Sequence, residues 1–107
     1  MVNIEKISTS AMEVITYSGM AKSCYMEALA LAKEGKFSEA DKKIVEGEEH
    51  FVGAHNGHMD VLQEEISTEE PQISLLMTHA EDQLMAAETL KIVIAELIEL
   101  YRERKGE

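Results

Sequence analysis

Apolar side chains recur at three- and four-residue steps along most of the chain, which is the spacing of one face of an α-helix. The first such run begins near Asn3, a residue that suits a helix N-cap, and ends at Gly35, which suits a C-cap. Only Ser18 interrupts it. The pattern therefore predicts a first helix over about residues 3–34, with this apolar face: Ile4, Ile7, Ala11, Val14, Ala21, Tyr25 and Leu29.

A second periodic run predicts a helix over about residues 38–66. We expect it to open at Ser38, with Asp41 three residues later as a weak capping box. Each of its three interior glycines costs about 1 kcal/mol relative to alanine, so we interpret them as points of close helix approach. The predicted inward face consists of Val45, Glu48, Val52, His55, Met59, Leu62 and Ile66. The three glycines are Gly47, Gly53 and Gly57.

The third run predicts a helix over about residues 71–104. Pro71 suits a first helical turn, and Arg102, Arg104 and Lys105 suit the carboxyl end of the helix dipole. Three helices this long, joined by short connections, predict an all-α fold, an antiparallel three-helix bundle. A chain of 107 residues forms one domain, residues 1–107.

The third predicted helix carries two apolar stripes instead of one. A helix that is apolar over so much of its circumference requires burial on two sides, and two partner helices of the same chain cover only one of them. We therefore infer a homo-oligomer built around this helix. The first stripe is Ile73, Leu76, Ala80, Ala87, Leu90, Ile94, Leu97 and Tyr101; the second is Leu75, His79, Asp82, Ala86, Val93, Leu97 and Leu100.

Charge and cysteine content narrow the class of partner. The chain has 10 basic and 21 acidic residues, for a formal charge of -11, which repels nucleic acid and anionic lipid alike. The lone Cys24 allows no disulfide within the chain and fits a reducing compartment. The amino-terminal region does not look like a signal peptide, and no segment reaches the roughly 20 apolar residues of a membrane span. We expect a cytoplasmic protein.

The candidate chemistry lies where His79 and Asp82 interrupt the apolar third helix. Burying such groups is costly unless they have partners. The spacing alone leaves three interpretations open: hydrogen-bonded packing, a metal ligand pair, or a histidine nucleophile toward phosphorus, for which a neutral imidazole is competent. His55 and His58 could join His79 and Asp82 as four metal ligands between neighbouring helices.

The remaining polar candidates receive structural interpretations. We expect His55 to be a core histidine, and His50 and His58 to be solvated. Cys24 reads as a small buried hydrophobic residue, because no basic pattern around it indicates a lowered pKa.

Several segments resemble one protein family over essentially the whole chain. The segment Ile73–Met85 (ISLLMTHAEDQLM), followed by IELY at 98–101, is similar to the C-terminal helix of the lactose/cellobiose (N,N'-diacetylchitobiose) type enzyme IIA of the bacterial phosphoenolpyruvate-dependent sugar phosphotransferase system. His-Ala-x-Asp is the most specific part of this resemblance. Upstream resemblances are AKS at 21–23, MEAL at 26–29, AKEG at 32–35 and LQEE at 62–65.

The resemblance implies a phosphoryl carrier. His79 would accept the phosphoryl group from the carrier HPr and pass it to a cysteine of the IIB component for disaccharide uptake, with the membrane reached only through the IIC transporter. It also implies a homotrimer in which Asp82 of each subunit binds one Mg²⁺ on the three-fold axis. Thr78 and Gln83 are the nearest hydrogen-bond donors for a phosphoryl oxygen. Which disaccharide is imported is decided by the membrane component, not by this chain.

A function of another class competes with this one. The chain could be a helical metal-binding or oligomerisation module, with His55, His58, His79 and Asp82 as its ligands. Phosphoryl transfer requires only His79 as the covalent residue, whereas the metal module should lose its ion when either His55 or His58 is removed.

Overall fold

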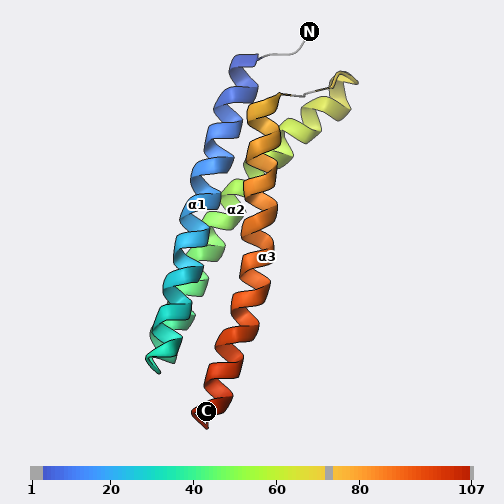
Figure 1. Ribbon diagram of the computed structural model, residues 1–107. Helices are drawn as coiled ribbons and strands as arrows, with labels where there is room; N and C mark the ends of the chain where they lie inside the picture. The colour runs from blue at the N-terminus through green and yellow to red at the C-terminus, as the bar shows by residue number, and fades with distance from the viewer. Residues whose placement is uncertain (1–3, 72–73, 107) are drawn as a thin grey trace.

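The computed structural model describes residues 4–71 and 74–106. They form three long antiparallel helices: α1 (Ile4–Lys33), α2 (Phe37–Thr68) and α3 (Leu75–Arg104) (Figure 1). The molecule is a rod of 58 × 18 × 17 Å. The all-α three-helix architecture expected from the sequence is confirmed.

The turn between α1 and α2 follows the sequence pattern closely. α1 ends at Lys33, and Gly35 adopts a φ of +80° in the turn that follows. The backbone N–H of Gly35 donates to the carbonyl of Ala32 (3.0 Å), and that of Lys36 donates to the carbonyl of Leu31 (2.9 Å). This pair of bonds is the Schellman ending that glycine favours. The expected N-cap Asn3 lies outside the described residues.

The other two helix starts differ from the prediction. α2 begins at Phe37, so Ser38 lies inside the helix and the expected capping box with Asp41 is wrong; Lys36 occupies the N-cap and its side chain makes no capping bond. Burial of Phe37 against the α1 core fixes this start instead. α3 begins at Leu75, which leaves Pro71 in the connection, because the Ser74 side chain caps the helix.

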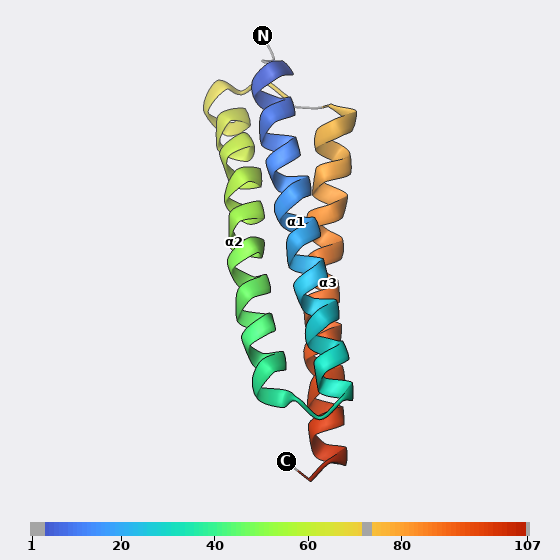
Figure 2. The ribbon, with the colours of Figure 1, turned by 90° about the vertical axis from the view of Figure 1, so that its left-hand side faces the viewer.

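The core is built on α1, which packs against both other helices while α2 and α3 contact each other much less (Figure 2). Small residues dominate its buried face, so the helices approach closely. The largest fully buried side chains are Tyr25, Met77 and Ile94. Ser18, which interrupts the apolar pattern of α1, is also completely buried.

The predicted inward face of α2 is wrong. Its large apolar residues Val45, Val52 and Ile66 are exposed, and so is His55. The helix instead turns its small residues toward the core, because α1 lies too close for bulky side chains. The buried set is Phe37, Ala40, Gly47, Ala54, Gly57 and Val61.

The two stripes of α3 separate as expected. The first stripe faces the core, with Ala80, Ala87 and Ile94 buried, although Leu97 is just exposed and Ile73 lies outside the described residues. The second stripe faces outward. Its members Leu75, His79, Asp82, Ala86, Val93, Leu97 and Leu100 are all exposed.

Candidate functional site

His79 and Asp82 lie near the start of α3, on its outward face. Ser74 anchors this end of the helix: its Oγ accepts a hydrogen bond from the backbone N–H of Met77 (3.0 Å). Both candidate side chains are exposed, while Ala80 between them is fully buried. Packing of Ala80 therefore fixes the backbone, and the imidazole and the carboxylate are left open to a partner.

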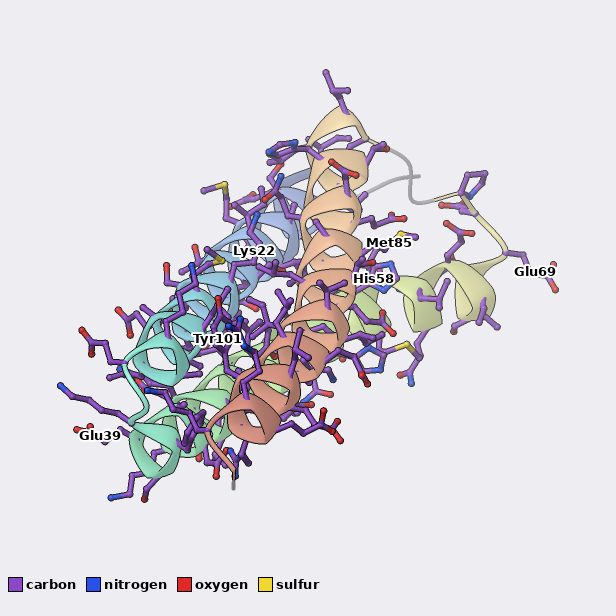
Figure 3. The ribbon with its side chains drawn as sticks, turned by 60° about the horizontal axis from the view of Figure 1, so that its bottom comes forward. Lys22, Glu39, His58, Glu69, Met85 and Tyr101 are labelled. Carbon is purple, nitrogen blue, oxygen red and sulfur yellow. The ribbon has the colours of Figure 1, made fainter. Side chains whose placement is uncertain are left out.

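The residues that flank His79 and Asp82 tie α3 to its neighbours. On one side, the Lys22 ammonium donates a hydrogen bond to Gln83 Oε1 (2.7 Å). On the other, His58 Nε2 lies 3.8 Å from Glu81 Oε2. Figure 3 shows Lys22 reaching from α1 toward α3, and His58 of α2 beside α3. Residues 79–83 of α3, the functional segment, therefore contact both other helices.

The two predicted hydrogen-bond donors differ in their surroundings. The Thr78 hydroxyl donates to the carbonyl of Ser74 (2.9 Å), so its proton is engaged within its own helix. Gln83 uses its Oε1 as an acceptor for Lys22, which leaves its amide N–H₂ group to face other acceptors. Gln83 also follows His79 by four residues, the spacing at which helix side chains meet.

Lys22 is the residue of this region that sequence reasoning missed. It is half-buried beside the inward stripe of α1 and brings a positive charge to Gln83. Lys22 directly follows Ala21 of the apolar face, and a lysine beside such a face is ordinarily solvated. Only the side-by-side packing of α1 and α3 places it near the functional segment.

The four-ligand metal site expected as an alternative is not assembled. Within the residues that the structure describes, His55, His58, His79 and Asp82 do not bring three ligand atoms together. The expectation of a core His55 is wrong, since the outward face of α2 carries it into solvent. His58 and His50 are half-buried instead of solvated; His58 faces Glu81, and His50 stacks on Tyr17 with ring centroids 6.4 Å apart.

Cys24 is buried, as the sequence suggested. Burial raises the pKa of its thiol, and the nearby Glu46 carboxylate raises it further. The thiol is therefore protonated at neutral pH, in agreement with a residue that packs and does not act as a free nucleophile.

Comparison with known proteins decides the family. A sequence model of the "PTS system, Lactose/Cellobiose specific IIA subunit" matches residues 9–102. The chain belongs to the lactose/cellobiose-specific IIA family of the phosphotransferase system. This IIA protein is 38% identical over 99 residues to the lichenan-specific phosphotransferase enzyme IIA component of Bacillus subtilis, covering 92% of this chain and 90% of the relative. It is 39% identical over 100 residues to the lactose-specific EIIA component of Lactococcus lactis, covering 94% and 95%.

Solved structures show the same fold. The PTS cellobiose-specific enzyme IIA from Bacillus anthracis superposes with a TM-score of 0.90 at 37% identity, over 100% of this chain and 96% of that one. The IIA(chitobiose) chain from the IIA–HPr complex of the Escherichia coli N,N'-diacetylchitobiose branch superposes with a TM-score of 0.83 at 28% identity, over 92% and 96%. This IIA protein is therefore a component of a sugar phosphotransferase system. Among the described residues, none of the helices contains an apolar stretch long enough to span a bilayer.

Proposed function

We propose that this IIA protein carries a phosphoryl group on His79, accepting it from HPr and passing it to a cysteine of a IIB component. The observation that carries the proposal is an exposed histidine on an outward helix face, next to Glu81 and Gln83, which contact the two other helices. The solved complex of a related chitobiose IIA chain with HPr supports HPr as the donor. In each transfer, the phosphorus leaves one side chain as it bonds to the next.

The surroundings of His79 suit the charge of the product. A phosphohistidine adds close to two negative charges, and the neighbouring carboxylates of Glu81 and Asp82 would oppose them. The Gln83 amide lies one helical turn from His79 and supplies hydrogen-bond donors. The Lys22 ammonium that binds Gln83 brings a positive charge to the same region. Because transfer between phosphohistidines requires mainly positioning and electrostatic stabilisation, these groups suffice without further covalent machinery.

A homotrimer and a shared Mg²⁺ are part of the same proposal. The outward stripe of α3 leaves Leu75 87% and Leu100 52% exposed, an apolar surface that a second copy would cover. Asp82 lies on that stripe and supplies one carboxylate per chain. Hard oxygen ligands of this kind suit Mg²⁺, and three carboxylates brought together would require a cation to offset their repulsion.

The deciding experiment measures intact mass after incubation with phosphoenolpyruvate, enzyme I and HPr. We expect an acid-labile phosphate adduct on the wild type and on His55→Ala, which alters an exposed histidine of α2. His79→Ala should show no adduct. Adding the cognate IIB should remove the adduct from the wild type. A wild type without an adduct, or an adduct on His79→Ala, would overturn the proposal.

A further inference from the structure

Three side chains with metal-binding atoms meet between α1 and α2, on other elements than His79 and Asp82. The Cys24 sulfur, a carboxylate oxygen of Glu46 and an imidazole nitrogen of His50 all lie within 4.8 Å of one another. In the described part of the chain, no other group of three such side chains brings its ligand atoms this close together. All three line one surface pocket, in which Glu46 is exposed, His50 is half-buried and Cys24 is buried.

The packing of the helices holds this cluster together. Glu46 and His50 are four residues apart, so they share one face of α2. Gly47 lies between them and faces α1, where a Cβ atom would be only 3.0 Å from Cys24 Cβ. Because glycine has no Cβ atom, the face of α1 that carries Cys24 can approach the face of α2 that carries Glu46 and His50. The His50 ring stacks on Tyr17 at an interplanar angle of 24°, which restrains its orientation.

We propose that Cys24, Glu46 and His50 form a binding site for one Zn²⁺-type divalent cation. Thiolate, imidazole and carboxylate are the three ligand types that Zn²⁺ uses in proteins. A tetrahedral site places ligand atoms about 3.5 Å apart. Ligand atoms that now lie within 4.8 Å of one another must therefore approach by up to about 1.3 Å. The exposed Glu46 side chain can rotate to do so, and the half-buried His50 ring can shift within its stack on Tyr17. The Cys24 thiol releases its proton to water on binding, and the fourth position remains for water.

The charges around the site are compatible with a dication. A Cys24 thiolate and the Glu46 carboxylate together carry two negative charges, which match the cation. Glu46 now pairs with Lys43 (3.0 Å), but Lys43 also pairs with Glu27 at the same distance. Lys43 can therefore keep Glu27 when Glu46 turns to the metal. Mg²⁺ prefers oxygen ligands and octahedral geometry, so this cluster selects a different ion from the one proposed at Asp82.

The test uses the full-length protein with Zn²⁺ in calorimetry and with Co²⁺ as a spectroscopic probe. We expect one ion per chain and a thiolate-to-cobalt charge-transfer band. Cys24→Ser should remove the band, and Glu46→Gln and His50→Gln should weaken Zn²⁺ affinity at least about tenfold. Glu49→Gln and His55→Gln are matched controls, because they alter exposed residues of the same helix. These two variants and Asp82→Asn should bind Zn²⁺ as the wild type does.

Zn²⁺ should also raise the melting temperature of the wild type, because it binds only the folded chain. His50→Gln, whose folding is checked by its helical circular dichroism, should lose this shift. The proposal is overturned if the wild type shows no charge-transfer band, if the band survives Cys24→Ser, or if His55→Gln weakens binding as much as His50→Gln.

Discussion

Gly47 sets the distance between α1 and α2 at the middle of the bundle. A Cβ atom built on it would lie 2.6 Å from Cε1 of the fully buried Tyr25. The ring cannot retreat easily, because its hydroxyl donates to Glu48 Oε2 (3.4 Å) and its sides are packed in the core. The absence of a side chain at this position thus decides how two helices pack.

We expect Gly47→Ala to destabilise the protein by about 1–3 kcal/mol, the usual cost of overpacking a core. Gly19→Ala is the control, since a Cβ there meets nothing within 4 Å; it should stabilise α1 by about 0.5–1 kcal/mol through helix propensity. Urea unfolding measures both. Equal effects of the two substitutions would contradict the role given to Gly47.

Lys22 provides the positive charge closest to Gln83, and its effect should appear in the rate of phosphoryl transfer. Loss of a hydrogen bond to a charged group costs roughly 1.5–3 kcal/mol, so we expect Lys22→Met to slow transfer from phosphorylated HPr about ten- to hundredfold. Rapid-quench kinetics measure the rate. Lys33→Met, which removes an exposed lysine at the far end of α1, should leave it unchanged. Similar slowing in both variants would indicate a general effect of charge.

At the scale of the helices, periodicity predicts which segments are helical better than it predicts which face is buried. The glycine ending of α1 could be predicted because Gly35 has a direct conformational role. The start of α2 could not, since burial of Phe37 outweighs the local capping preference of Ser38. The inward face of α2 could not be predicted either. Hydrophobicity favoured the face that carries Val45 and Val52, but the close approach of α1 places alanines and glycines against the core instead.

Ser74 fixes where α3 begins and therefore where His79 lies. Replacing an N-cap serine by alanine costs about 1 kcal/mol, so we expect Ser74→Ala to lower the free energy of unfolding by this amount. Ser67→Ala, an exposed serine near the end of α2, should have little effect. Chemical denaturation measures both variants. A Ser74→Ala protein as stable as the wild type would mean that another interaction fixes this helix end.

At the scale of the whole molecule, the single chain leaves much of its large apolar surface uncovered. Met85 is 65% exposed and Ile92 58%, both on α3, and Val45 and Ile66 of α2 are exposed as well. The outward stripe of α3 could be predicted from the sequence, because the two other helices of the chain cover only one side of α3. It could not predict the Lys22 contact, since that contact joins residues 61 positions apart in the chain.

Oligomerisation and cation binding can be separated at Asp82. If three copies meet along the outward stripe of α3, Asp82→Leu replaces a cluster of carboxylates by apolar side chains, and substitutions of this kind keep or strengthen an assembly. We therefore expect light scattering to report a trimer for the wild type and for Asp82→Leu, while calorimetry finds Mg²⁺ only with the wild type. Asp60→Leu, at an exposed position of α2, should keep both trimer and Mg²⁺. A monomeric wild type at micromolar concentration would contradict the assembly, and a dissociated Asp82→Leu would show that the cation itself holds the subunits together.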